Sequence, residues 1–244
     1  MQNETVPADS HKTHLPQTQK FEIGKDYKYI SNNPFFLFFS FLFKYLIIYP
    51  VFFTITKVVL GYKVVGRSNI KKLDGGTVTV SNHVHVLDAP MISFSLFPKQ
   101  PRITSIKGNF QTPGVSFLVK VLGAVPIPET PNELKEFFDA MTKEVNRGGI
   151  VHFYPEAALW PGFTEIRPFK KGAFHLAASA DVQVLPMLIK QREPKGVFRL
   201  YKKKPCITVI IGEPIKANKD LSSKQSVLDI RQRTHDAITK LLEV

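Results

Sequence analysis

The chain has 244 residues, of which 43% are hydrophobic and 22% charged, and its net charge is +13. This composition excludes a disordered or low-complexity chain and allows a sizeable core. The positive charge indicates an anionic partner, which could be nucleic acid, an acidic membrane surface or a phosphorylated substrate. The single cysteine, Cys206, excludes an internal disulfide and a cysteine-based zinc site, and it indicates a reducing compartment.

The first 60 residues divide into a polar part and an apolar part. Residues 1–33 contain no short apolar run behind a basic start, so we expect a disordered arm and no cleavable signal peptide. In residues 34–60 the composition changes, because twenty of the 26 residues from Phe35 to Leu60 are apolar. A helix needs about 20 residues to cross a bilayer. The segment therefore predicts a membrane-associated, anchoring helical part.

Two residue types refine this expectation. A central lysine, Lys44, costs about 3 kcal/mol against about 8 kcal/mol gained from the apolar residues, so it does not forbid insertion. Pro50 predicts a break into two short helices that dip into one leaflet, with Lys44 and Lys57 reaching the headgroups. The alternative is the buried core helix of a soluble protein. The apolar segment favours an acidic membrane over nucleic acid, for which the sequence carries no recognition motif.

From Gly61 onward, short β-rich runs alternate with helical patterns, which predicts one α/β domain over residues 61–244. We expect a mostly parallel or mixed sheet flanked by helices. The predicted strands are Tyr62–Val65, Thr77–Ser81, Ile103–Ile106, Ala124–Ile127, Ile150–Tyr154, Val184–Ile189 and Ile207–Ile211. The predicted helices are Asp88–Phe97, Pro113–Leu122, Glu133–Asn146, Lys171–Ala180 and Ser222–Leu242. Ligands bind beyond the carboxyl ends of such strands, so we expect the site in the loops after Ser81 and Tyr154.

The loop after Ser81 carries His83 and, five positions later, Asp88. Three interpretations compete. His83 and His85 with Asp88 are similar to the start of a metallo-β-lactamase-type ligand set, although Ala89 stands where a histidine is required. Asp88 could instead be the N-cap of the next helix. In the third interpretation, Asp88 orients His83 so that the imidazole takes a proton from a hydroxyl.

The run Asn82–Asp88 resembles motif I, His-x-x-x-x-Asp, of the 1-acylglycerol-3-phosphate acyltransferase family. Later runs resemble the family's other motifs in the same order. Leu122–Glu129 resembles motif II, Gly-x-x-x-Ile-x-Arg, and Phe153–Leu159 resembles motif III, Phe-Pro-Glu-Gly-Thr-Arg, with Ala157 at the glycine position. The continuation Ile166–Ala173 and the run Val184–Met187 also match the family. The resemblance covers the chain from about Gly61 to Pro214. It implies a membrane-bound enzyme of phospholipid biosynthesis that moves a fatty acyl group from acyl-CoA or acyl carrier protein to a lysophospholipid hydroxyl. The default acceptor is 1-acylglycerol-3-phosphate, and no cofactor is implied.

The resemblance implies that His83 and Asp88 form the catalytic pair and that Glu156, in motif III, takes part in substrate binding. Glu156 also has a structural alternative, because a buried carboxylate can cap the turn after Pro155. We expect an apolar groove for the acyl chain that opens to the leaflet, along Pro113–Leu122.

Motifs II and III depart from the family at the arginines that hold the acceptor's phosphate. Glu129 and Leu159 stand at those two positions, and bidentate arginine is hard to replace for phosphate. The basic residues that remain nearby are Arg167, Lys170 and Lys171, which we expect to bind substrate. The alternative is that this basic cluster is a solvated face against anionic lipid.

These features lead to three hypotheses of different classes. The first is an acyltransferase on the cytoplasmic face of a membrane, acting on 1-acylglycerol-3-phosphate or a different lipid acceptor, with membrane lipids and the acyl donor as partners. The second is a non-catalytic lipid-binding protein that keeps the fold, motivated by the lost motif arginines. The third is a metal-dependent hydrolase, which predicts bound zinc.

Overall fold

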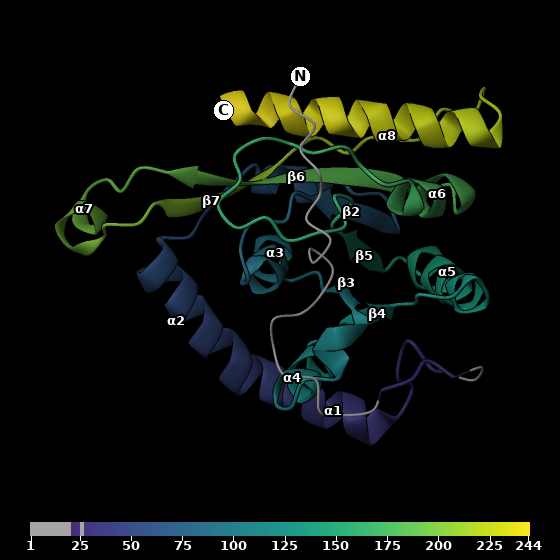
Figure 1. The fold of residues 1–244 in the computed structure, drawn as a ribbon, viewed down its shortest axis with the longest axis horizontal. Coiled ribbons are helices and arrows are strands. Elements are labelled where there is room, and N and C mark those ends of the chain that lie inside the picture. The colour runs from purple at the N-terminus through teal and green to yellow at the C-terminus, as the bar shows by residue number, and fades with distance from the viewer. Residues whose placement is uncertain (1–20, 25–26) are drawn as a thin grey trace.

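A seven-stranded sheet with helices on both faces forms the body of the protein (Figure 1). The computed structural model describes residues 21–24 and 27–244. The strands are β1 (Lys63–Val65), β2 (Thr77–Ser81), β3 (Pro101–Ile106), β4 (Val125–Ile127), β5 (Ile150–Phe153), β6 (Gln183–Arg192) and β7 (Cys206–Ile211). Their order across the sheet is β1-β7-β6-β2-β5-β3-β4.

The sheet is mixed, with most strands running in one direction. β2 pairs in parallel with both β5 and β6, and β3 pairs in parallel with β5 and β4. β7 is antiparallel to β6 and parallel to β1. The predicted α/β fold with a mostly parallel or mixed sheet is confirmed.

The helices cover the sheet in two layers. They are α1 (Pro34–Phe43), a π-helical turn (Lys44–Ile48), α2 (Tyr49–Leu60), α3 (Asp88–Leu96), α4 (Val115–Val121), α5 (Pro131–Asn146), α6 (Gly172–Ser179), α7 (Val197–Tyr201) and α8 (Ser223–Lys240). Three 3₁₀ turns span Arg67–Lys72, Lys107–Phe110 and Leu241–Glu243. In Figure 1, α8 lies along one face of the sheet and α3 lies under the other.

Alternating side chains of the strands build a core on each face. In β6, Val184 and Leu188 pack with α5, α6 and α8, whereas Leu185 and Ile189 pack with α3 and α2. Successive strand residues point to opposite faces, so a run that is apolar at every position must be covered on both sides. This is why the central strands read as continuous apolar runs.

Each predicted strand and each of the five predicted helices after Gly61 is present, with no end displaced by more than three residues. The predictions missed α7, a five-residue helix at the tip of the β6–β7 hairpin. It lies between Gly196 and a run of three lysines, and such a short segment has no periodicity that distinguishes it from a loop.

The apolar segment forms one continuous helix, Pro34–Leu60, so the predicted break at Pro50 is wrong. The backbone N–H of Tyr49 donates to the carbonyl of Lys44, five residues back, instead of four. This π-helical turn widens the backbone just before Pro50, whose ring would otherwise meet the carbonyl of Leu46. The proline is therefore accommodated inside the helix. By length and composition, this is the one helix in the described part of the chain that could cross a membrane.

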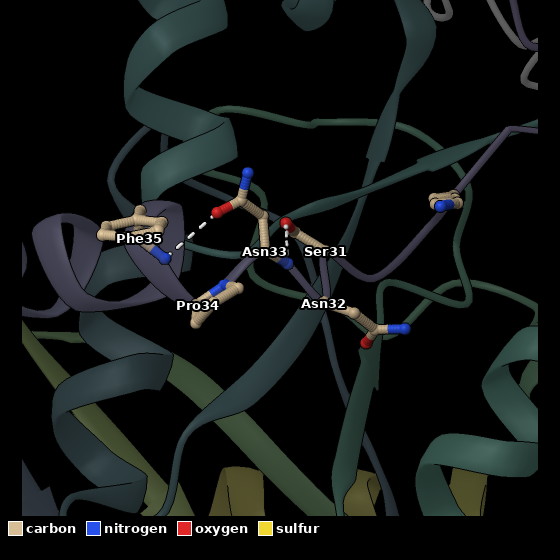
Figure 2. Close-up of a pocket in the computed structure, with 6 residues that line it drawn as sticks. Ser31, Asn32, Asn33, Pro34 and Phe35 are labelled. Carbon is tan, nitrogen blue, oxygen red and sulfur yellow. Dashed lines mark hydrogen bonds between the residues drawn. The ribbon is translucent and has the colours of Figure 1, made fainter.

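A polar cap starts this helix. The side-chain Oδ1 of Asn33 accepts a hydrogen bond from the backbone N–H of Phe35 at 3.0 Å, and Pro34 occupies the first turn (Figure 2). The same oxygen accepts a hydrogen bond from the backbone N–H of Phe36 at 3.2 Å. Ser31 in turn accepts a hydrogen bond from the N–H of Asn33 at 3.3 Å. Asparagine before a proline is a favoured start, since the proline lacks the N–H that a helix start leaves unpaired.

One side of the helix packs on the domain and the other is bare. The rings of Tyr49 and Phe53 lie 5.1 and 5.8 Å from that of Phe94 in α3, and Phe43 lies 5.6 Å from Phe117 in α4. The exposed large side chains of the helix include Phe35, Phe38, Phe39, Phe41, Leu46, Ile47, Val51, Val58 and Val59. The alternative of a buried core helix is therefore wrong.

The expected disordered arm covered residues 1–33, and residues 1–20, 25 and 26 lie outside the described part. The remainder is packed. Ile23 and Tyr29 are 4% and 8% exposed in the core, and the ring of Phe21 stacks on Phe110 at 5.1 Å. For these residues the expectation of a free arm is wrong, because their aromatic and aliphatic side chains cover α5 and the turn before α4.

We predict that Gly76→Ala lowers the free energy of unfolding by about 1–3 kcal/mol. A β-carbon on Gly76, just before β2, would lie 1.8 Å from the carbonyl oxygen of Val145 in α5, which is backbone that cannot move aside alone. The matched control is Gly24→Ala, because a β-carbon there meets nothing within 4 Å. Denaturant titration in mild detergent measures both, and equal stability of the two variants would contradict the prediction.

Candidate active site

The site lies where two neighbouring parallel strands end. β2 pairs with β5 from Thr77↔Ile150 to Val80↔Phe153, so the loops that follow Ser81 and Phe153 leave the sheet side by side. The first loop carries His83 and the second carries Tyr154 and Glu156. The two loops that the sequence selected are therefore brought together, as expected for the carboxyl ends of parallel strands.

His83 and Asp88 form a close pair. His83 Nδ1 lies 2.8 Å from Asp88 Oδ2, and the aspartate side chain is fully buried while the histidine side chain is 24% exposed. The same oxygen accepts hydrogen bonds from the N–H groups of Val84 (2.8 Å) and His85 (2.9 Å). The carboxylate thus holds the turn that carries the histidine. Leu87, not Asp88, is the N-cap of α3, so the capping interpretation is wrong.

One ring face of His83 lies against Tyr154, and its second nitrogen, Nε2, differs from Nδ1 in its contacts. Its ring stacks on Tyr154 with centroids 4.0 Å apart and planes at 19°. Nε2 makes no hydrogen bond with any described residue. Because a carboxylate on Nδ1 keeps the proton there, Nε2 carries the free lone pair. The arrangement can therefore accept a proton from a hydroxyl that approaches from solvent or from the membrane.

Tyr154 is a site residue that sequence reasoning missed. Burial and the charge of Asp88 raise the pKa of its hydroxyl far above the ordinary value, so the ring stays neutral. Its hydroxyl and Asp88 Oδ1 are both buried without a hydrogen-bond partner among the described residues. The signal that could have found it is its position directly before Pro155 in motif III, at the end of β5.

A second histidine, His152, lies beneath the site in β5. It is fully buried, with Nδ1 2.9 Å from the hydroxyl of Thr79 and its ring 4.7 Å from that of Tyr154. Burial, and secondarily the neighbouring His83, lower the pKa of His152 to about 3. An imidazole that stays neutral and enclosed supports the floor of the site and does not reach a substrate.

Glu156 joins two segments through backbone groups. Its Oε2 accepts from the N–H of His83 at 3.4 Å, and its Oε1 accepts from the N–H of Arg167 at 3.2 Å. The residue is 7% exposed, and burial raises the pKa of its carboxyl despite these bonds. These contacts favour the structural alternative, in which the carboxylate positions the histidine loop, and its role toward substrate stays a prediction.

Arg167 lies against the same loop. Its guanidinium carbon is 3.6 Å from the ring centroid of Trp160. The backbone N–H of Trp160 donates a hydrogen bond to the carbonyl of His83 at 2.9 Å. Gly162 similarly donates to Val84 at 3.1 Å. The arginine is half-buried as a result, and it is near the histidine loop without pairing with a carboxylate side chain of the described residues.

An open cleft of about 530 Å³ adjoins Tyr154. Its apolar lining includes Ile106, Ile127, Leu134, Phe137, Phe138 and Phe153. Its charged lining residues are Lys107, Glu129 and Lys170, none of which forms an ion pair with another described side chain. Lys107 was not identified from the sequence, because it lies in a turn outside every motif. Lys171 and the predicted groove along Pro113–Leu122 do not line this cleft.

Motif III also carries a strained residue. Ala157 has φ +61°, the left-handed region that glycine favours, and it is exposed at the edge of the cleft. The resembled family has glycine at this position. This backbone conformation is one that a glycine at position 157 would adopt without strain.

No group of three or more His, Cys, Asp or Glu side chains that could hold a metal ion is found over residues 21–24 and 27–244. His83 and Asp88 instead contact one another, as described above.

Comparisons with known proteins assign the chain to a family. The family model described as Acyltransferase matches residues 61–190, which is more than half of the chain, so the chain belongs to this acyltransferase family. It is 24% identical over 204 residues to 1-acyl-sn-glycerol-3-phosphate acyltransferase of Saccharomyces cerevisiae, covering 79% of this chain and 64% of that protein. It is 29% identical over 125 residues to a chloroplastic 1-acyl-sn-glycerol-3-phosphate acyltransferase of Brassica napus, covering 51% of this chain and 36% of that protein.

A solved structure shows the same fold. The crystal structure of the 1-acyl-sn-glycerophosphate (LPA) acyltransferase PlsC from Thermotoga maritima aligns over 88% of both chains with a TM-score of 0.60 and 24% identity. The chain thus shares nearly the whole fold of that protein, whereas it spans less than two thirds of the length of the two relatives above.

We predict that His152 makes the protein lose stability as the pH falls below about 6.5. The unfolded chain binds a proton at His152 with an ordinary pKa near 6.5, whereas the folded chain does so only near 3. Between these values the unfolded state takes up the proton, so the free energy of unfolding falls by about 1.4 kcal/mol per pH unit.

Denaturant unfolding in mild detergent at several pH values measures this slope. His152→Gln keeps polar groups near Thr79 and Ser81 but cannot gain the charge, so its slope should be shallower. An identical slope in the two proteins would assign the acid sensitivity to other groups.

Proposed function

We propose that the protein transfers a fatty acyl group from acyl-CoA or acyl carrier protein to the hydroxyl of a lysophospholipid, 1-acylglycerol-3-phosphate, in phospholipid biosynthesis. The observation that carries the proposal is the 2.8 Å contact of His83 Nδ1 with the buried Asp88, which leaves Nε2 without a hydrogen-bond partner among the described residues. Tyr154, whose ring stacks on His83, lines the neighbouring cleft. Membership of the acyltransferase family supports the reaction class, and the printed names of the relatives support the acceptor.

The proposed step needs no covalent intermediate. The acceptor hydroxyl loses its proton to His83 Nε2 as its oxygen attacks the thioester carbonyl. The carbon–sulfur bond then breaks, and the leaving thiolate takes the proton from the imidazolium. Asp88 stabilises the imidazolium while it exists and holds the ring in place, and Tyr154 restricts the ring from one face. No metal or redox cofactor enters this step.

The cleft beside Tyr154 suits an amphiphilic acceptor. Its apolar lining can contact a glycerolipid body, and Lys107 and Lys170, which have no ion-pair partner among the described residues, offer two cations to an anionic headgroup. We propose that Lys170 binds the phosphate directly, that Arg167 and Lys171 add positive potential nearby, and that Glu156 orders the loops between them. Lysine replaces arginine here as a point charge and not as a bidentate partner.

One observation favours a second candidate acceptor. Glu129 lines the same cleft as Lys170, so the cleft carries charges of both signs. A lysophospholipid whose headgroup contains both an ammonium and a phosphate would match such a pair. A panel of lysophospholipid acceptors with one acyl donor separates the two candidates by the ratio of their kcat/KM values.

We propose that the helix Pro34–Leu60 lies within one leaflet and does not cross the bilayer. Residues 61–244 would then form the acyltransferase domain on the cytoplasmic face. The support is that both α1 and α2 contact the domain through α4 and α3, while the opposite side of the helix is bare and apolar. If a helix that packs on the domain along its length crossed the bilayer, the polar surface of the domain would also have to enter the hydrocarbon layer. The single free cysteine fits a reducing compartment.

His83→Ala should lower kcat at least about 100-fold, because the general base is lost. Circular dichroism and vesicle binding should be unchanged, since Asp88 keeps its backbone partners Val84 and His85. The matched control is His85→Ala in the same loop, which removes an imidazole whose one hydrogen bond within the described part of the chain is accepted from the backbone N–H of Leu87. Initial-rate assays with radiolabelled acyl donor measure both variants.

Near-normal turnover of folded His83→Ala would refute the pair as the catalytic machinery. Absence of transfer by the unaltered protein, with every donor and acceptor tested, would favour the non-catalytic lipid-binding hypothesis instead. Stoichiometric zinc in the purified protein would favour the hydrolase.

Lys170→Ala should raise KM for a phosphorylated acceptor about 10-fold while kcat changes little, because a charge-assisted contact of the headgroup is removed. Lys143→Ala is the control, since Lys143 is exposed on α5 and does not line the cleft. Steady-state kinetics at saturating acyl donor measure both. An unchanged KM in Lys170→Ala would place the headgroup elsewhere.

A further inference from the structure

The hairpin between β6 and β7 projects beyond the sheet and ends in α7. Its strands stay paired up to Arg192↔Cys206, and residues 193–205 form the projecting tip. In Figure 1, α7 lies past the C-terminal end of α2, on the continuation of the line that α1 and α2 follow. The proposed catalytic pair does not involve this tip.

The tip is tied to the end of the apolar helix. Tyr201 donates a hydrogen bond from its hydroxyl to the carbonyl of Val58 at 2.9 Å, and Lys202 donates to the carbonyl of Val59. Arg192 donates to the carbonyl of Gly61. These carbonyls are among the last of the helix, which have no partners within it. These hydrogen bonds therefore join the hairpin to the C-terminal end of α2.

The tip exposes apolar side chains that the fold does not cover. Leu200 is 85% exposed, Val197 is 63% exposed and Tyr201 is 53% exposed. At the adjoining end of α2, Val58 and Val59 are 53% and 55% exposed. Two exposed apolar patches that adjoin across a hydrogen-bonded joint form one continuous apolar surface, which marks an interaction site.

A strong positive charge surrounds these apolar side chains. Residues 192–204 contain six basic residues and one acidic residue, Glu193. Of the basic residues, Lys195, Arg199, Lys203 and Lys204 are exposed and form no ion pair with another described residue. A cluster of lysine and arginine around exposed apolar residues matches the acidic headgroups above a hydrocarbon layer.

From this juxtaposition we propose that the α7 hairpin is a second membrane-contact element, which inserts Leu200 and Val197 into an anionic leaflet and seats its basic residues on the headgroups. An acidic soluble protein could satisfy the charges, but it would leave the apolar surface that continues from α2 half covered. Two attachment points, the helix and the hairpin, would fix the orientation of the domain above the leaflet. The proposal rests on membrane association and not on the catalytic assignment.

Site-specific fluorescence tests the proposal on the full-length chain. In a Cys206→Ser background, Leu200→Cys carries an environment-sensitive fluorophore, and Val59→Cys and Lys224→Cys serve as controls on α2 and on the far-side helix α8. Vesicles contain zwitterionic lipid with a minor fraction of anionic lipid. The emission at positions 200 and 59 should shift to the blue and be quenched by nitroxide-labelled acyl chains, whereas position 224 should stay in water.

The proposal is overturned if position 200 remains as accessible to aqueous iodide as position 224 while position 59 is in lipid. It is also overturned if an acidic protein such as acyl carrier protein, and not vesicles, protects position 200. Because position 59 reports on the helix alone, these outcomes do not depend on enzymatic activity.

Charge reversal gives a second measurement. Lys203→Glu with Lys204→Glu should weaken binding to anionic vesicles at least about 10-fold and leave binding to purely zwitterionic vesicles unchanged. Lys224→Glu with Lys240→Glu makes the same change of net charge on α8 and should have a much smaller effect. Equal losses in the two double variants would reduce the effect to overall charge and contradict a local contact.

Discussion

The parallel pairing of β2 with β5 is the constraint on which the site depends. It brings the ends of two strands together, so that a loop with His83 and Asp88 meets a loop with Tyr154 and Glu156. Asp88 closes its own loop through two backbone N–H groups and the imidazole, and Glu156 joins that loop to the segment at Arg167. The histidine is thereby held by buried carboxylates although its own side chain remains accessible.

Local features of this site could be predicted from the sequence, whereas long-range features could not. His83 and Asp88 are five residues apart, so the sequence offered them as a pair, and the resemblance to motif I selected the catalytic interpretation among the three. Tyr154 and His83 are 71 residues apart in the sequence, and their rings stack only because β2 pairs with β5. No local sequence pattern predicts this contact. The carboxylate of Glu156 contacts only backbone N–H groups among its described partners, and such partners carry no sequence signature.

The same distinction applies to the fold. Strands and helices of the domain follow from alternation and apolar runs, and their order matched the structure. The effect of Pro50 was misjudged because a π-helical turn can absorb the missing N–H without ending the helix. The packing of Ile23 and Tyr29 was missed because the segment around them has only a few apolar residues. Each of these residues packs against elements that are distant in the sequence.

The protein combines an apolar helix that has a bare outer side, a cleft with charged lining residues and a histidine whose Nε2 has no hydrogen-bond partner among the described residues. Each part fits the proposed reaction at a lipid surface: the helix is long and apolar enough to enter a membrane, and the cleft lined by Tyr154 has the mixed apolar and charged lining that an amphiphile needs. The charge pattern of the cleft, with Glu129 among lysines, distinguishes this chain from the family pattern it resembles.

The central claim is that Asp88 keeps the proton of His83 on Nδ1 and leaves Nε2 as the base. Nitrogen-15 NMR of histidine-labelled protein in lipid nanodiscs, with His83→Gln to assign the signal, tests it most directly. The neutral imidazole of His83 should be the Nδ1–H tautomer, and Asp88→Ala should abolish that preference. A dominant Nε2–H tautomer in the unaltered protein would contradict the account.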